Sequence, residues 1–270
     1  MGLCLETPEA QVVVMISATT EWKSVREYFA DASYQDSPFG EWCCVTLSLE
    51  EATRTVVFLH GGWGKIAAAA STQYVIDRWK PRLLVNLGTC GGIDGAIEPG
   101  TVILVESTVV YDIVEQMGDP EEAIAHYATT LDLSWLREPY PIPVCRTGMV
   151  SADRDLVVEE LPLLQARHGA IAGDWESGAI AYVAQRNQAP CLILRGVTDV
   201  VGAQGDDTYG NFYLFVERSA WIMGLLIDSL PAWLSNARQL YGLCLQTLGF
   251  PRQINQTAHI LFLPTSLCRR

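Results

Sequence analysis

Short apolar runs alternate along the chain with segments in which apolar residues recur at helical spacing. The runs predicted as strands cover residues 12–16, 55–60, 83–87, 102–107 and 190–197. The segments predicted as helices cover residues 21–28, 66–79, 177–186 and 212–229. This alternation predicts an α/β fold in which helices cover both faces of a largely parallel sheet.

The loops that follow the predicted strands carry the residues of chemical interest. In a sheet of this kind, ligands bind at the carboxyl ends of the strands. We therefore expect the loops after Ile16, Leu87 and Val197 to share one edge of the sheet, together with the stretch 149–153.

Two acidic residues in the second half of the chain lie at predicted element ends. Asp199 follows the strand 190–197, and Glu176 falls in the first turn of a helix that Asp174 caps. Either carboxylate could face a cleft and take part in a reaction. Either could instead be structural, with Glu176 complementing the helix dipole and Asp199 capping a loop or the next helix.

Length, composition and charge limit the possible functions. With 270 residues, 49% of them hydrophobic, the chain can bury a sizeable core, and we expect one domain over residues 12–234. Residues 1–11 are expected to form an N-terminal extension and residues 235–270 a C-terminal tail. A net charge of −13 without a clustered Lys/Arg stripe argues against nucleic-acid and anionic-membrane partners.

Targeting and metal-binding signals are also missing from the sequence pattern. We expect no secretory signal, and no apolar stretch is long enough to span a bilayer. The eight cysteines show no pair or Cys/His cluster with metal-ligand spacing. We therefore expect reduced thiols, a cytoplasmic location and no metal site.

Two cofactor motifs come close to the glycine-rich stretch Gly62-Trp63-Gly64-Lys65-Ile66-Ala67. It fits the Gly-x-Gly-x-x-Gly/Ala dinucleotide fingerprint between a strand and a helix, but Asn86-Leu87-Gly88 stands where that fold needs an acid for the ribose. The P-loop fails as well, since Ile66 replaces the Ser or Thr that binds magnesium. We therefore expect no cofactor.

Four glycine-rich or acidic stretches occur in a fixed order along the chain. They are Gly61-Gly62-Trp63-Gly64-Lys65-Ile66-Ala67-Ala68-Ala69, Asn86-Leu87-Gly88-Thr89-Cys90-Gly91-Gly92, Asp174-Trp175-Glu176-Ser177-Gly178-Ala179-Ile180-Ala181 and Arg195-Gly196-Val197-Thr198-Asp199. Together they resemble the nucleoside phosphorylase/nucleosidase superfamily, most of all the methylthioadenosine/S-adenosylhomocysteine nucleosidases. The resemblance runs from about Val12 to about Leu230. It implies a three-layer αβα sandwich around a mixed, mostly parallel sheet, a purine nucleoside and water as substrates, and a homodimer.

The resemblance gives three acids separate roles in cleaving an N-glycosidic bond. Asp199 would protonate the purine as the bond breaks, Glu176 would hold the ribose hydroxyls, and Glu21 would position the attacking water. Such cleavage places positive charge on the sugar and moves negative charge into the base. An acid at the base and a carboxylate at the sugar therefore suit the reaction, and general acid catalysis typically contributes about 10²–10⁴-fold.

The resemblance also implies a set of substrate-binding residues. Thr198 matches the polar residue that supports the acid, and the stretch 151–156, with Asp155 and Leu156, matches a segment whose backbone grips adenine. The other expected binding residues are Ala18, Trp63, Thr89, Cys90, Gly91, Asp174, Trp175 and Glu176.

Two tryptophans depart from the family pattern. Trp63 fills a position that is smaller in the resembling enzymes and faces the 5′ substituent, and Trp175 replaces a Met beside Glu176. For each, the alternative is packing in the core. If both face the cleft, the 5′ pocket is reshaped, and futalosine becomes a candidate substrate beside methylthioadenosine.

The choice between hydrolysis and phosphorolysis depends on one position. A phosphorylase must bind phosphate, usually through an arginine. Asn86 occupies the position where the resembling phosphorylases have that arginine, and this favours a hydrolase. A purine nucleoside phosphorylase, and a non-catalytic nucleoside-binding or storage protein, are the alternatives.

Overall fold

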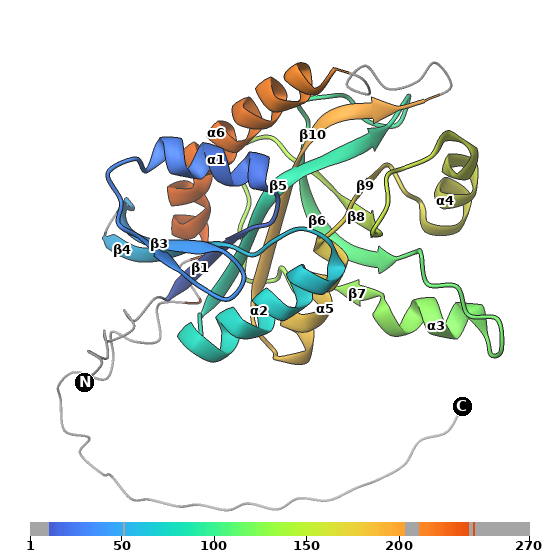
Figure 1. Ribbon diagram of the computed structural model, residues 1–270, viewed down its shortest axis with the longest axis horizontal. Coiled ribbons are helices and arrows are strands. Elements are labelled where there is room, and N and C mark those ends of the chain that lie inside the picture. Colours follow the sequence, from blue (N-terminus) through green and yellow to red (C-terminus); the bar gives the residue numbers. More distant parts are fainter. Residues whose placement is uncertain (1–10, 51, 203–210, 238–239, 241–270) are drawn as a thin grey trace, which may run out of the picture.

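One sheet of ten strands forms the centre of the described part of the protein in the computed structural model (Figure 1). The structure describes residues 11–50, 52–202, 211–237 and 240. The strands are β1 (Val12–Ile16), β2 (Tyr34–Asp36), β3 (Glu41–Ser48), β4 (Thr53–His60), β5 (Leu83–Ile93), β6 (Val102–Val110), β7 (Thr129–Thr130), β8 (Cys145–Ser151), β9 (Ala172–Asp174) and β10 (Cys191–Val201). The helices are α1 (Thr19–Tyr28), α2 (Lys65–Trp79), α3 (Pro120–Tyr127), α4 (Leu161–His168), α5 (Ser177–Arg186) and α6 (Phe212–Asn236).

Five of these strands close on one another. The order across the sheet is β10, β6, β8, β9, β5, β1, β4, β3 and β2, with β7 beside β6. Because β10 also pairs with β5, the strands β10, β6, β8, β9 and β5 form a closed ring. The remaining strands from β1 to β2 extend from this ring as an open sheet.

Parallel and antiparallel pairings are equally frequent among the described strands. The parallel pairs are β1–β4, β1–β5, β5–β10, β6–β8 and β8–β9. The antiparallel pairs are β6–β10, β2–β3, β3–β4, β5–β9 and β6–β7. The fold is therefore α/β with a mixed sheet, and the expectation that parallel pairing dominates is not confirmed.

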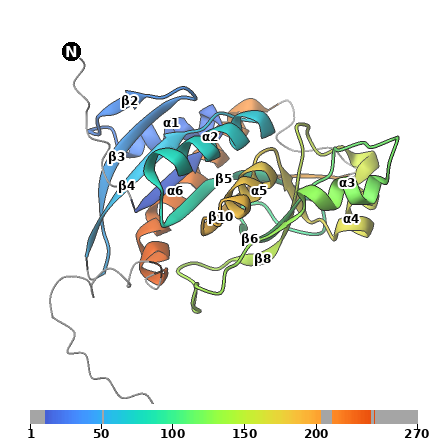
Figure 2. The ribbon, with the colours of Figure 1, turned by 90° about the horizontal axis from the view of Figure 1, so that it is seen from below.

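The residues of β1 face two different cores because side chains alternate along a strand. All five are fully buried. Val14 lies in one apolar cluster with Leu226 of α6, whereas Met15 lies in another with Val75 of α2 and Ile180 of α5. Helices thus cover both faces: α1 packs against α6, and α2 against α5 (Figure 2).

The strands β5 and β10 continue beyond their predicted ends. They stay paired in parallel from Cys191 to Val201, with a register shift between Val197 and Asp199. Asp199 therefore lies inside β10 rather than past its end, and Thr89, Cys90 and Gly91 lie inside β5 rather than in a loop. The apolar pattern stops before these positions, but hydrogen bonds between β5 and β10 keep both backbones extended beyond it.

The helix α5 has its predicted bounds, but Glu176 is placed differently from the expectation. Glu176 is the residue immediately before the helix, not a member of its first turn. The carboxylate of Asp174 accepts hydrogen bonds from the backbone N–H of Ser177 at 3.1 and 3.2 Å, so Asp174 satisfies an N–H at this helix end as predicted.

The expected N-terminal extension, residues 1–11, lies outside the described residues except for Gln11. Of the expected tail, residues 235–270, the structure describes residues 235–237 and 240. Within the described part of the chain, no helix is long and apolar enough to cross a membrane.

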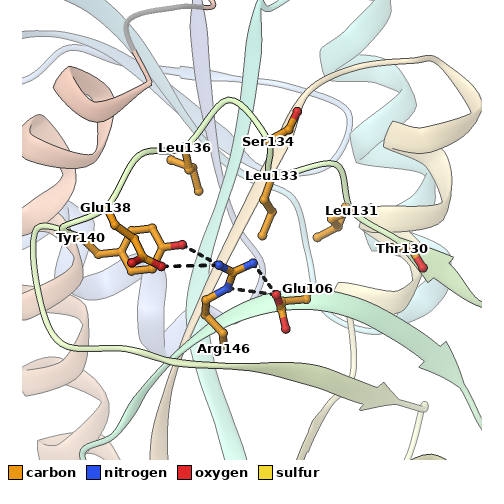
Figure 3. A pocket seen from close by; sticks show the side chains of 9 residues that line it. All are labelled: Glu106, Thr130, Leu131, Leu133, Ser134, Leu136, Glu138, Tyr140 and Arg146. Carbon is orange, nitrogen blue, oxygen red and sulfur yellow. Dashed lines mark hydrogen bonds and ion pairs between the residues drawn. The ribbon is translucent and has the colours of Figure 1, made fainter.

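A cavity of about 460 Å³ lies between β6, β8 and the segment 130–140 (Figure 3). Arg146 crosses it: Nε donates to Glu106 Oε1 at 2.9 Å and Nη1 donates to the Tyr140 hydroxyl at 2.9 Å. Glu138 lies 3.8 Å from Nη1. The guanidinium of Arg146 thus contacts Glu106 on β6 as well as Glu138 and Tyr140, and it thereby links the segment 130–140 to the sheet.

Trp233 should be one of the main stabilising side chains of the core that α6 covers. It is fully buried and stacks on Tyr140 at a centroid distance of 5.6 Å. We expect Trp233→Ala to lower the free energy of unfolding by about 3–5 kcal/mol, measured by urea denaturation. Trp221→Ala, on the same helix at 58% exposure, should cost less than about 1 kcal/mol. Equal losses for the two variants would contradict this.

Candidate active site

A cavity of about 800 Å³ lies past the ends of β1 and β4 and beside the C-terminal halves of β5 and β10. Every binding or catalytic residue expected from the sequence lines it. These residues are Ala18, Glu21, Trp63, Thr89, Cys90, Gly91, Asp155, Leu156, Asp174, Trp175, Glu176, Thr198 and Asp199. The cavity is also lined by residues that were not among those expected: Thr19, Thr20, Tyr111, Arg154, Gly173, Val201, Phe212 and Phe215.

The pairing of β9 with β5 brings distant parts of the sequence to this cavity. Gly173 pairs with Gly91, and Ala172 with Gly92. The residues that follow β9, including Glu176, therefore lie beside the Thr89–Gly91 portion of β5. These two backbone pairings join residues that are 82 and 80 positions apart in the sequence.

Arg195 lies beneath the cavity and was not expected to have a role. Its side chain is fully buried, with Nε 2.8 Å from Asp174 Oδ2 and Nη2 donating to Asn86 Oδ1 at 2.7 Å. Nη2 also lies 3.9 Å from Glu176 Oε2. A buried charge is tolerated only when it is paired and hydrogen-bonded, so Arg195 requires these acceptors. An arginine inside the apolar run of residues 191–197 was the available signal for it.

Gly88 makes room for this arginine. It pairs with Arg195 across β5 and β10. A Cβ at position 88 would lie 1.9 Å from Arg195 Nη1 and 2.9 Å from Glu21 Oε1. No side chain fits there, and Nη1 and the Glu21 carboxylate approach the same point. Nη1 has no hydrogen-bond acceptor within the described residues.

Glu21 is held in a single orientation by donors on two elements. It is 3% exposed, and its Oε1 accepts from the Thr89 backbone N–H at 2.6 Å and the Thr89 hydroxyl at 2.9 Å. Its Oε2 accepts from the Ala18 N–H at 3.2 Å, closing the first turn of α1. The carboxyl oxygens of Glu21 have further lone pairs, which can accept hydrogen bonds from a ligand or a water molecule.

Glu176 is buried beside two other acids. Its Oε1 accepts from the backbone N–H of Gly64 at 3.0 Å, which links the start of α5 to the loop before α2. Burial raises the pKa of Glu176 to about 8; Arg195 opposes this shift, while Asp174 and Glu21 reinforce it. A ligand that carries positive charge or hydroxyl donors would therefore stabilise the ionised form.

Asp199 faces the cavity at the register shift in β10. A Cβ on Gly91 would lie 3.4 Å from Asp199 Oδ2. The hydroxyl of Thr198 donates to Asp199 Oδ1 and also lies 3.3 Å from the carbonyl oxygen of Cys90. The carbonyl of Thr198 accepts from Arg218 Nη1 at 2.9 Å, so α6 holds the strand at the acid.

Two tryptophans and a cysteine complete the walls. Trp63 is 63% exposed, so the core-packing alternative does not hold for it. Its ring lies 5.5 Å from that of Trp175, tilted by 40°. Burial raises the pKa of Cys90 well above its usual range, so it lines the cavity as a neutral thiol.

The described residues contain no group of His, Cys, Asp or Glu that could hold a metal ion. In the same part of the chain, the cysteines Cys43, Cys44, Cys90, Cys145 and Cys191 are free thiols.

Comparison with known families identifies a match over most of the chain. A model described as "Phosphorylase superfamily" matches residues 11–229. The chain is 28% identical over 174 residues to the 5′-methylthioadenosine/S-adenosylhomocysteine nucleosidase of Thermotoga maritima, covering 64% of this chain and 77% of that protein. It is 25% identical over 191 residues to the nucleosidase of the same name from Tolumonas auensis, covering 66% and 83%.

Solved structures share the fold at lower identity. A putative 5′-methylthioadenosine/S-adenosylhomocysteine nucleosidase from Francisella philomiragia aligns with a TM-score of 0.67 at 12% identity, covering 83% of this chain and 98% of that one. A mutant of the Helicobacter pylori enzyme with 5′-methylthioadenosine in its active site aligns with a TM-score of 0.66 at 16% identity, covering 83% and 99%. Futalosine hydrolase of Helicobacter pylori aligns with a TM-score of 0.65 at 16% identity, covering 82% and 97%.

Glu176 should make the protein less stable as pH rises. The folded protein keeps this proton up to about pH 8, whereas the unfolded chain releases it near 4.5. The native state therefore binds more protons between these values, and the free energy of unfolding falls with increasing pH in that window. Glu176→Gln should flatten the fall by up to about 1.4 kcal/mol per pH unit, measured by urea denaturation across the window.

Glu27→Gln is the matched control, because Glu27 is an exposed glutamate on α1. It should retain the wild-type slope. If Glu176→Gln and wild type show parallel dependences on pH, the buried carboxyl does not titrate as described.

Proposed function

Because the chain belongs to the phosphorylase superfamily, we propose that it hydrolyses the N-glycosidic bond of a 5′-substituted adenosine-type nucleoside, such as methylthioadenosine or S-adenosylhomocysteine. The observation that carries the proposal is the presence of three carboxyl groups, Glu21, Glu176 and Asp199, in one cavity. The names of the two relatives from Thermotoga maritima and Tolumonas auensis support the same reaction.

In this reaction the three acids act on different parts of the nucleoside. Glu21, held by the backbone N–H and the hydroxyl of Thr89, orients a water molecule toward C1′. Asp199 gives a proton to the purine ring as the C1′–N bond breaks with its electron pair moving into the base. The water oxygen keeps one of its hydrogens and becomes the new hydroxyl at C1′. The other hydrogen leaves as a proton, which balances the proton that Asp199 gave to the base.

Glu176 binds the ribose hydroxyls in this scheme. Ionised, its carboxylate favours the positive charge that develops on the sugar, which is the charge most in need of stabilisation. Burial raises the pKa of Glu176, and it also strengthens the attraction between the ionised carboxylate and the positively charged sugar.

The environment of Asp199 suits an acid that alternates between two protonation states. The Thr198 hydroxyl has one proton and two acceptors within reach, Asp199 Oδ1 and the carbonyl oxygen of Cys90. It donates to Asp199 when that group is a carboxylate. When Asp199 carries a proton, the hydroxyl can accept from it and donate to Cys90 instead.

Hydrolysis is favoured over phosphorolysis by the charge around the nucleophile. Asn86, at the position of the phosphorylase arginine, is buried; it donates to the Met15 carbonyl oxygen and accepts from Arg195. Glu21 would face an incoming phosphate at short range and repel it. A water nucleophile, in contrast to phosphate, needs only a hydrogen-bond acceptor such as Glu21 and no cationic side chain to bind it.

We further infer a three-layer αβα sandwich with one domain over residues 12–234, a homodimer and a cytoplasmic location. Helices on both faces of the sheet support the first of these.

A nucleoside panel in buffer with and without phosphate tests the reaction. We expect wild type to release free adenine from methylthioadenosine at the same rate in both buffers. The amount of adenine over time is measured by chromatography. Asp199→Asn should lower kcat by about 10²–10⁴-fold because the leaving base is no longer protonated. Asp228→Asn, an exposed acid on α6 bonded to Tyr28, is the control and should keep wild-type kcat.

Strict dependence on phosphate would establish a phosphorylase and contradict the proposal. Absence of base release from any purine nucleoside would contradict enzymatic function altogether.

A further inference from the structure

Two indole rings occupy a part of the cavity that none of the proposed catalytic steps uses. Trp63 belongs to the connection between β4 and α2, and Trp175 lies between β9 and α5. Both line the cavity, and their ring centroids are 5.5 Å apart. Their position relative to the acids indicates which part of a substrate they meet.

The strand order separates Trp63 from the acid. The strands β10, β5, β1 and β4 are successive neighbours in the sheet. With strands about 4.8 Å apart, β4 lies roughly 14 Å from β10, which carries Asp199. Glu21, after β1, and Thr89, on β5, lie between them. A nucleoside with its base at Asp199 and its sugar at Glu21 would therefore direct its 5′ group toward Trp63.

The backbone directly after Trp63 is fixed by hydrogen bonds. Gly62 and Gly64 have φ angles of +80° and +83°, which glycine adopts without strain. The N–H of Gly64 donates to Glu176, and the N–H of Lys65 donates to Asp153 Oδ1 at 2.6 Å. The ring is thus exposed in a loop whose backbone is tied down, and a ligand would not have to order it.

The charges of the cavity restrict what these rings can bind. Five acidic side chains and one arginine are among the described residues that line it: Glu21, Asp155, Asp174, Glu176, Asp199 and Arg154. Arg154 is paired with Glu160 at 3.0 Å. Because Arg154 is already paired, an anionic group on the substrate finds no unpaired cation among the described residues that line the cavity. An uncharged planar group, in contrast, can stack on an indole face.

We propose that Trp63 and Trp175 form an outer subsite that selects nucleosides with an uncharged aromatic group at C5′, in preference to a hydroxyl, a small alkyl thioether or an anionic tail. This inference rests on the proposed hydrolysis of a nucleoside in the same cavity. It makes the two tryptophans determinants of specificity rather than parts of the catalytic machinery.

The test is the ratio of kcat/KM for 5′-phenylthio-5′-deoxyadenosine to that for methylthioadenosine, with adenosine and adenosine 5′-monophosphate as further substrates. We expect wild type to favour the phenylthio compound by about tenfold or more, since stacking on one aromatic side chain typically has an effect of this size. The monophosphate should be the poorest substrate. Trp63→Ala should bring the ratio close to one, and Trp63→Phe should retain most of it.

Trp221→Ala is the matched control, because it removes another exposed tryptophan that does not line the cavity. It should leave the ratio at its wild-type value. A wild-type ratio of one or below would overturn the inference, as would a Trp63→Ala variant that loses activity equally on both thioethers.

Failure of the proposed function gives a different result. If wild type releases no base from any of these nucleosides, hydrolysis is wrong, and dissociation constants measured by calorimetry then decide the inference. Tighter binding of the phenylthio compound, lost in Trp63→Ala, would still support the subsite. Equal binding of both thioethers would contradict it.

Discussion

Burial of one positive charge, the guanidinium of Arg195, governs the arrangement of the candidate site. A charge without solvent must be surrounded by acceptors, and here they come from Asn86 on β5 and Asp174 on β9. The same requirement excludes a side chain from Gly88. Because Asp174 also accepts from the N–H of Ser177, the first residue of α5, the arginine helps to fix where that helix begins and thereby the position of Glu176 beside the cavity.

The three carboxyl groups occupy different surroundings, and this gives them different chemistry. Glu21 is fixed by Thr89 and Ala18, Glu176 is buried among other acids, and Asp199 has a hydroxyl partner that can reverse its hydrogen bond. The closed ring of five strands brings the three carboxyl groups to one cavity, because β9 pairs with β5 next to Thr89, which contacts Glu21. Cleavage of a glycosidic bond needs this kind of division between sugar, base and nucleophile.

Much of the local structure follows from the sequence alone. The strand β1 and the helix α5 have the predicted bounds because their apolar patterns are unbroken, and the thirteen expected residues all line one cavity. Short or polar strands such as β2, β7 and β9 carry no such pattern; pairing with neighbours holds them. The closed ring, the extension of β10 through Asp199 and the role of Arg195 depend on contacts between distant residues, which periodicity does not encode.

The central claim is that water, held at Glu21, becomes the hydroxyl at C1′ of the released sugar. Turnover of methylthioadenosine in ¹⁸O-labelled water, with mass spectrometry of the sugar after rapid quenching, measures this directly. The account predicts one labelled oxygen in the sugar of every turnover, with phosphate present or absent. An unlabelled sugar 1-phosphate as the product would contradict it.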